Sequence, residues 1–332
     1  MKSMYPALIF WCVVPFMFAA NTSSAQSESR PNESRLSKRQ LYTKHLSLRF
    51  RTPVLSIAHN GDRIWVGAGN EIHVLNENLQ TQQRIVTELD FIHDLQLDKS
   101  VLVAAGGSPA EHGMIELYQS QTLEFVKRKL LHEDVIHQVD IVNGQLVTAS
   151  ADSKVKVSDL NTLEPQFTYS SHSKRVNCLM PLSPGLGIVS AGMDDTLRVW
   201  DLRSGKTQRT LTHHQADVLD VGLKKKEDQS LPMIVSVSRD RTIRFWQPTI
   251  GRMVRFLKIG EVPTRCAWLA DTDDVFVGTD KGQLIRVDSL SLEKKQIADL
   301  GERIYSIATF GDRKLLVGTS RHLYLVPIGT QE

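Results

Sequence analysis

A short apolar segment recurs seven times along almost the whole chain, and successive copies begin 37 to 46 residues apart. A period in this range, in a sequence rich in strand-forming residues, indicates the blades of a β-propeller. We therefore expect an all-β, seven-bladed β-propeller over residues 44–330. The seven segments are Ile64–Gly67, Val101–Ala104, Leu146–Ala149, Ile188–Ala191, Ile234–Val237, Val275–Gly278 and Leu315–Gly318.

Each repeat begins with an inner strand whose apolar residues stand three apart, as Val54 and Ile57 do in the first unit. This spacing breaks the two-residue alternation of a flat strand and predicts a bulge. The last unit ends near Ile328 without an outer strand, whereas residues 45–50 provide a spare strand before the first unit. Pairing of this N-terminal strand with the last unit would close the ring and hide its edges.

The N-terminus has the features of a secretory signal peptide. Lys2 precedes an apolar stretch over residues 7–20, and the small residues Ser23 to Ala25 predict cleavage after residue 25. The apolar stretch has only fourteen residues and contains Pro15, whereas a membrane-spanning helix needs about 20. We therefore expect residues 1–25 to be removed and no stable membrane anchor to remain.

Residues 26–43 are polar and predict a flexible leader, because they can bury little apolar surface. The mature protein is expected to be exported: periplasmic in a Gram-negative bacterium, otherwise secreted. The even balance of 40 basic and 37 acidic residues argues against a nucleic-acid partner. Cys178 and Cys266 fall in different units, so we expect two buried thiols rather than a disulfide.

The third to fifth units resemble WD40 repeats, most clearly in the segments Asp152–Asp159, Ser190–Asp201 and Ser236–Gln247. The resemblance implies one hydrogen-bonded network per blade, formed by a His, a Ser, an Asp and a Trp. The third unit keeps the His and the Asp but has Thr148 and Ser158 in place of the Ser and the Trp. The implied network residues are His132, Asp152, His172, Ser190, Asp194, Trp200, His214, Ser236, Asp240 and Trp246.

A His, a Ser and an Asp in one chain also suggest a nucleophilic triad. Recurrence in two successive units, with Trp as a fourth member, favours a structural network instead. His132 and His137 are five positions apart and not the four of a zinc-protease helix. We expect no enzyme activity, no cofactor and no metal site.

In each inner strand, the residue two positions after the first apolar residue is expected to face the central channel. We expect these residues to form a small polar lining with water. Counting from Thr264 in the sixth unit, the ring is Ser56, Asp94, Gln138, Cys178, Asp220, Cys266 and Ser306.

Loops on one rim of a propeller vary while the sheets stay fixed, which suits recognition of a partner protein. We interpret the protein as a monomeric, noncatalytic interaction scaffold or assembly factor outside the cytoplasm, for instance an accessory protein of a periplasmic respiratory enzyme such as nitrate reductase. The alternative is an enzyme or a small-ligand or metal-binding propeller that uses the channel. The predicted partner-binding residues are Arg175, Met193, Asp217, Arg239, Arg265 and Tyr305.

Overall fold

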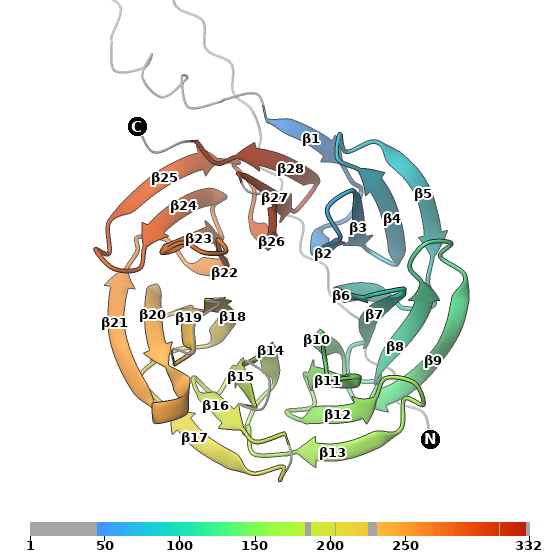
Figure 1. The fold of residues 1–332 in the computed structure, drawn as a ribbon, viewed down its shortest axis with the longest axis horizontal. Coiled ribbons are helices and arrows are strands. Elements are labelled where there is room, and N and C mark those ends of the chain that lie inside the picture. Colours follow the sequence, from blue (N-terminus) through green and yellow to red (C-terminus); the bar gives the residue numbers. More distant parts are fainter. Residues whose placement is uncertain (1–44, 183–186, 203, 225–230, 312, 330–332) are drawn as a thin grey trace, which may run out of the picture. The chain divides into compact units, whose positions relative to one another are not determined.

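The computed structural model describes residues 45–182, 187–202, 204–224, 231–311 and 313–329. In the compact unit Leu41–Glu332, strands β1 to β28 form seven four-stranded antiparallel sheets around a central axis (Figure 1). The described residues include one short 3-10 helix, η2 (Pro248–Ile250). The predicted all-β, seven-bladed propeller is thereby confirmed. The predicted signal peptide (1–25) and leader (26–43) lie outside the described residues.

Blades one to six each use four consecutive strands, from the inner strand beside the axis to the outer strand at the circumference. Blades one to three consist of β2 (Val54–His59), β3 (Arg63–Ala68), β4 (Glu71–Asn76) and β5 (Thr81–Val86); β6 (Phe91–Asp98), β7 (Val101–Ser108), β8 (His112–Gln119) and β9 (Phe125–His132); and β10 (Ile136–Val142), β11 (Gln145–Ser150), β12 (Val155–Asp159) and β13 (Pro165–Tyr169). Blades four to six consist of β14 (Val176–Pro181), β15 (Ile188–Gly192), β16 (Leu197–Trp200) and β17 (Thr207–Leu211); β18 (Val218–Lys224), β19 (Met233–Ser238), β20 (Thr242–Gln247) and β21 (Arg252–Lys258); and β22 (Pro263–Trp268), β23 (Asp274–Thr279), β24 (Gln283–Asp288) and β25 (Lys294–Asp299).

Blade seven is built from both ends of the propeller. Its strands β26 (Ile304–Phe310), β27 (Lys314–Thr319) and β28 (His322–Pro327) are completed by β1 (Leu46–Arg49), which pairs antiparallel with β28 so that Leu46 lies opposite Leu325. This confirms the predicted closure of the ring by the N-terminal strand. Closure removes the two free edges that an open arc would expose.

Apolar side chains fill the space between neighbouring blades, and small residues let the inner strands approach one another. The last residue but one of the second strand is a glycine in blades one, six and seven. A Cβ atom at Gly318 would lie 2.6 Å from Cγ1 of Val54 in blade one, and a Cβ at Gly278 would lie 2.5 Å from Cγ2 of Ile304 in blade seven. Both distances are far inside van der Waals contact, so larger residues at these positions would force neighbouring blades apart.

Every inner strand contains the predicted irregularity, because the register with the second strand shifts by one residue near its start. In blade six the shift lies between Pro263 and Arg265. The residue that corresponds to Ser56 and its counterparts is therefore Arg265. The prediction that Cys266 belongs to the ring was wrong by one position. It was counted from Thr264, whereas Pro263 takes the place of the first apolar residue.

At six of the seven junctions between neighbouring blades, a side chain close to the register shift forms a hydrogen bond with the next blade. At three junctions a side-chain oxygen accepts a backbone N–H of the next blade: Asp94 from Val139 at 3.0 Å, Gln138 from Leu179 at 2.9 Å, and Asp220 from Cys266 at 2.9 Å. At three others a side chain donates to a backbone carbonyl of the next blade: Asn177 to Val218 at 2.7 Å, Thr264 to Ile304 at 2.7 Å, and Ser306 to Val54 at 3.0 Å. These bonds give backbone groups of the inner strands a hydrogen-bond partner in the neighbouring blade.

Candidate functional site

Blades four and five each contain a buried chain of four hydrogen-bonded side chains. In blade five, Nδ1 of His214 lies 2.8 Å from Oδ2 of Asp240, and Nε2 of His214 lies 2.7 Å from Oγ of Ser236. Nε1 of Trp246 donates to the same Oγ at 2.8 Å. Blade four repeats the arrangement, with the corresponding distances of 2.9, 2.7 and 2.6 Å among His172, Asp194, Ser190 and Trp200.

The direction of each bond follows from the donors available. The indole N–H of Trp246 can only donate, so it occupies a lone pair of the Ser236 oxygen. The Ser236 hydroxyl then donates to Nε2 of His214, and the Nδ1–H of His214 donates to Asp240. A catalytic serine needs an accessible oxygen with a free lone pair. Ser236 and Ser190 are fully buried, and each oxygen already accepts an indole N–H, so the geometry is that of a structural network.

The electrostatics of blade five agree with this assignment. Burial lowers the pKa of His214, and the hydrogen bond with Asp240 opposes this only in part. Burial raises the pKa of Asp240, but hydrogen bonds from His214 and Thr242 outweigh it and hold this pKa well below its ordinary range. At neutral pH a neutral imidazole therefore faces a carboxylate, and both are satisfied by hydrogen bonds.

Each aspartate of these networks also fixes two loops on the same face of the disc. Oδ2 of Asp240 accepts the backbone N–H of Gln215 at 3.1 Å, in the loop that leads into blade five. Its Oδ1 accepts the backbone N–H of Thr242 at 2.9 Å, in the turn between the second and third strands. Asp194 and Asp152 bond in the same way to the corresponding loops of blades four and three. Three successive blades therefore present rigid loops on one rim.

Blade three has the shorter form of the network. His132 bonds through Nδ1 to Asp152 at 2.9 Å and through Nε2 to the hydroxyl of Thr148 at 2.7 Å. Ser158 occupies the position of the tryptophan, and its buried Oγ has no hydrogen-bond partner among the described residues. The side chain is too short to reach the position that the indole N–H occupies in blades four and five.

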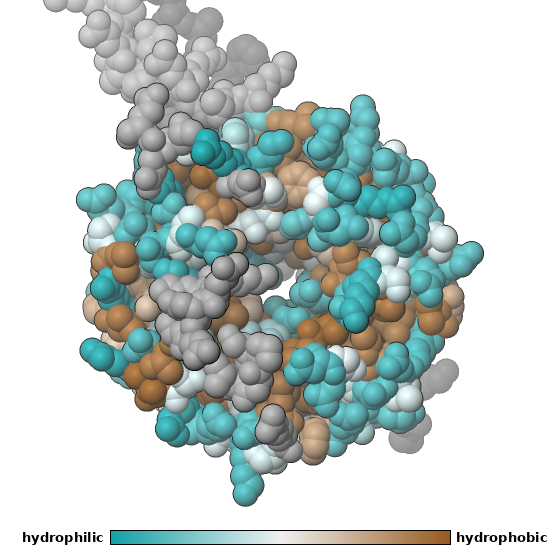
Figure 2. Space-filling model, in the orientation of Figure 1, coloured by the Kyte–Doolittle hydropathy of each residue, from teal (hydrophilic) through white to brown (hydrophobic). Residues whose placement is uncertain are grey.

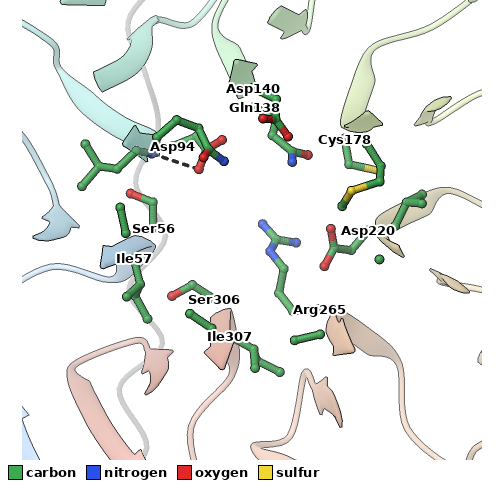
Figure 3. A pocket seen from close by; sticks show the side chains of 18 of the residues that line it. Ser56, Ile57, Asp94, Gln138, Asp140, Cys178, Asp220, Arg265, Ser306 and Ile307 are labelled. Carbon is green, nitrogen blue, oxygen red and sulfur yellow. Dashed lines mark hydrogen bonds between the residues drawn. The ribbon is translucent and has the colours of Figure 1, made fainter. Parts of the chain in front are cut away.

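The axis of the disc holds a cavity of about 700 Å³ lined by the inner strands of all seven blades. Figure 2 shows the opening of this channel near the centre of one face, with both hydrophilic and hydrophobic residues beside it. In the close view, the guanidinium of Arg265 extends towards the middle of the channel, with Asp220 beside it and Asp94 across from it (Figure 3). The residues of the inner ring are Ser56, Asp94, Gln138, Cys178, Asp220, Arg265 and Ser306.

Burial strongly affects the titratable groups of the channel. It raises the pKa of Asp94 to about 8 and lowers the pKa of His93 to about 4 and of His137 to about 3. It also raises the pKa of Cys178 and Cys266 well above the ordinary value, so neither thiol is activated as a nucleophile. Both thiols are free and buried. Over the described ranges, no group of three or more His, Cys, Asp or Glu residues could hold a metal ion.

Comparison with protein families finds the WD domain, G-beta repeat, at residues 163–201 and 205–247. Each match runs from the outer strand of one blade through the third strand of the next, and together the matches contain the two complete networks. Residues 163–201 and 205–247 thus match the WD40 repeat. The two matches coincide with the blades in which the Trp, Ser, His and Asp are all present.

Curated relatives include "Nuclear distribution protein PAC1" of Ajellomyces capsulatus, which is 32% identical over 93 residues, or 28% of this chain and 20% of the relative. "Methylosome protein WDR77" of Xenopus laevis is 28% identical over 169 residues, or 48% of each chain. The chain thus spans less than half the length of either relative.

A chain in the "Crystal Structure of Mitotic Checkpoint Complex" superposes with a TM-score of 0.76 at 17% identity, covering 95% of this chain and 99% of that chain. This likeness shows the propeller fold alone. Within the part of the chain that the structure describes, no helix is long and apolar enough to cross a bilayer.

Four of the six predicted partner-binding residues lie on the loops of WD40 blades four and five. Met193 is 37% exposed and its N–H donates to the carbonyl of Arg175 at 3.0 Å. Nε of Arg239 lies 3.3 Å from Oδ2 of Asp217, and their backbones are also hydrogen-bonded. Nε of Arg175 is buried and has no partner among the described residues.

The other two predicted residues lie apart from this group. Tyr305 is on β26 of blade seven, across the disc from blade four (Figure 1), and the guanidinium of Arg303 lies 5.3 Å from its ring centre. Arg265 lines the channel and belongs to its inner ring. The one-residue error in blade six explains why Arg265 was assigned to the loops instead of the channel.

Two sets of polar residues were missed by the sequence pattern. In blade seven, Glu302 lies before the inner strand and accepts hydrogen bonds from Thr319 at 2.8 Å and the N–H of Arg321 at 2.9 Å, while Nδ1 of His322 lies 2.9 Å away. The acid and the histidine have exchanged places relative to the WD40 blades, so the WD40 spacing could not detect them. In the channel, His93 and His137 meet edge to face with ring centres 5.3 Å apart.

Proposed function

We propose that this chain is a noncatalytic protein-docking scaffold whose docking face is the rim of loops on WD40 blades three to five. The proposal rests on the hydrogen bonds of three aspartates, Asp152, Asp194 and Asp240. Each carboxylate accepts backbone N–H groups from two loops of its blade and so holds both loops in place. Loops fixed before binding lose little conformational entropy on association.

The chemistry of the displayed side chains supports a protein partner. Met193, Arg239 and Arg175 are of the types enriched at protein interfaces, where Arg and Met are favoured over Lys and Glu. The pairing of Arg239 with Asp217 leaves a half-exposed guanidinium that an acidic residue of a partner can reach. Names of the similar proteins also refer to assemblies, namely a methylosome and a mitotic checkpoint complex.

We place this function outside the cytoplasm. The support is the apolar stretch at residues 7–20 followed by Ser23 to Ala25. An accessory role for a periplasmic respiratory enzyme such as nitrate reductase is the narrower form of the proposal, with the protein acting as a monomer. The two curated relatives described above are eukaryotic proteins whose names mention no such enzyme, so this setting depends on the sequence alone.

Affinity capture from native cells tests the docking face. The double variant Met193→Glu, Arg239→Glu is compared with a control, Arg209→Glu, Arg252→Glu, that changes two residues of the outer strands β17 and β21. The proposal predicts that wild type and control capture the same specific partner and that the loop variant loses it. Capture of the same partner by a folded loop variant would contradict the proposal. Fractionation with N-terminal sequencing tests export, and the expected mature N-terminus is Gln26.

A further inference from the structure

Arg265 is the one Lys or Arg among the described residues that line the central cavity. Most of its hydrogen-bonding capacity is unused among the described residues: Nη1 donates to the backbone carbonyl of Thr264 at 2.8 Å. No ion pair joins Arg265 to a carboxylate anywhere in the described ranges of the chain. A guanidinium has five N–H donors, so several point into the cavity without a protein acceptor.

The neighbouring carboxylates are already engaged in holding blades together. Asp94 accepts the N–H of Val139 through Oδ2 at 3.0 Å and the N–H of Leu95 through Oδ1 at 2.9 Å. Asp220 accepts the N–H of Cys266 through Oδ2 at 2.9 Å. Oδ2 of either aspartate cannot turn towards Arg265 without releasing a backbone donor of the next blade. Arg265 interacts electrostatically with Asp94 and Asp220 but forms an ion pair with neither, so its N–H groups stay available to a ligand.

Further uncharged hydrogen-bonding groups surround the same space. His93 and His137 line the cavity, both interact electrostatically with Arg265, and both are neutral at pH 7 because their pKa values are lowered to about 4 and about 3 by burial. Nε2 of His137 is buried and has no hydrogen-bond partner among the described residues. A neutral imidazole can donate one N–H to a ligand without adding charge.

We propose that the central channel binds a small oxyanion, a carboxylate or a phosphate group, through the guanidinium of Arg265. The planar fork of arginine matches two oxygens of either group, and charge-assisted bonds of this kind are about twice as strong as neutral ones. A cavity of about 700 Å³ holds a ligand of metabolite size around that group. This site is separate from the docking face, because it lies on the inner strands and not on the loops of blades three to five.

Isothermal titration of the full chain with inorganic phosphate and, separately, with acetate tests the proposal and distinguishes the two oxyanion classes. Ionic strength is held constant with chloride. Wild type is expected to bind at least one probe saturably, and Arg265→Gln is expected to bind it at least about ten-fold more weakly. Arg265→Lys keeps the charge but loses the fork, so its affinity should lie between the two. The control Arg239→Gln, on the docking face, should stay within about two-fold of wild type.

A second measurement needs no variant. The side-chain NMR signals of His93 and His137 should shift during the same titration, with the same midpoint, because an anion beside Arg265 changes the field at both rings. Saturable binding that is unaffected in Arg265→Gln, or titrations with both probes that leave the two histidine signals unmoved, would overturn the proposal. Loss of partner capture by loop variants bears on the docking face alone, so the two proposals can fail separately.

Discussion

The hydroxyl of Ser306 donates to the backbone carbonyl of Val54 at 3.0 Å, although 252 positions separate the two residues in the sequence. This bond joins the last blade to the first at the axis, while β1 joins them at the circumference. The closed ring is therefore held together at both its inner and its outer radius.

Close approach at the same junction makes Gly318 sensitive to substitution. A Cβ at this position would lie 2.7 Å from the carbonyl oxygen of Val54, so Gly318→Val should lower the free energy of unfolding by about 1–3 kcal/mol. Urea denaturation measures the change. Gly260→Ala is the control, because a Cβ there meets nothing within 4 Å, and it should stay within about 0.5 kcal/mol of wild type. Equal effects of the two substitutions would show that blade seven can move away from blade one.

Trp246 and Trp65 allow the indole hydrogen bond to be separated from the loss of ring volume. Both are buried, but Nε1 of Trp246 donates to Ser236 whereas Nε1 of Trp65 has no partner among the described residues. Trp246→Phe should therefore destabilise the protein by about 1 kcal/mol more than Trp65→Phe. Thermal and urea unfolding of the two variants give the comparison. If Trp65→Phe proves as costly, the network bond adds no stability.

The hydroxyl of Ser158 in blade three should not be needed for stability, whereas the hydroxyl of Ser236 in the complete network of blade five should be. Ser158 is buried without a partner, so Ser158→Ala is expected to leave stability unchanged or to raise it by up to about 1 kcal/mol. Ser236→Ala removes two bonds, to His214 and Trp246, and should cost about 2–3 kcal/mol. Destabilisation by Ser158→Ala comparable to that of Ser236→Ala would reveal a hydrogen bond at Ser158.

The channel histidines should make the protein sensitive to mild acid. The folded pKa values of His93 and His137, about 4 and about 3, lie below the unfolded value of about 6.5. The unfolded state then binds more protons as the pH falls below about 6.5, so the free energy of unfolding decreases from there towards the folded pKa values. His93→Gln, His137→Gln should flatten this decrease in urea titrations between about pH 6.5 and pH 4. An unchanged slope in the double variant would assign the acid sensitivity to other groups.

Asp94 should make the protein less stable as the pH rises above neutral, which is opposite to the effect of the histidines. Its folded pKa, raised to about 8, exceeds the ordinary value of 3.8, so the folded state binds more protons between these values. The free energy of unfolding should therefore fall as the pH rises towards 8, and Asp94→Asn should remove much of this loss. Unfolding at pH 6, 7, 8 and 9 measures the slope, with the exposed Asp62→Asn as control. A wild-type stability that rises with pH over this range, with the slope unchanged in Asp94→Asn, would contradict the assignment.

Much of the fold could be predicted because apolar residues repeat at positions that must face neighbouring blades. The spacing of Val54 and Ile57 predicted the inner bulge, and the spare strand before Val54 predicted closure. In blade six the same rule failed, because Pro263 occupies the first apolar position and Thr264 was counted in its place. A one-residue error along an inner strand moves each side chain to a different environment, so Arg265 was placed on the wrong part of the molecule.

The bonds between blades could not be predicted from one repeat. Asp94 and Val139, for example, belong to different blades, and the residue that accepts a backbone N–H of the next blade is Asp94, Gln138 or Asp220. At three other junctions the backbone group is instead a carbonyl, and the donors are Asn177, Thr264 and Ser306. A pattern in residue types does not reveal a contact whose partner is a backbone group of another blade.

Pairing of β1 with β28 has a consequence for biosynthesis. Leu46 emerges from the ribosome well before its partner Leu325, which lies 279 positions later in the sequence. Until β28 is synthesised, β1 has no native neighbour, and the six complete blades cannot supply one. The ring therefore closes only after β28 has been made, and a chaperone that shields β1 until then would raise the yield of correctly closed molecules.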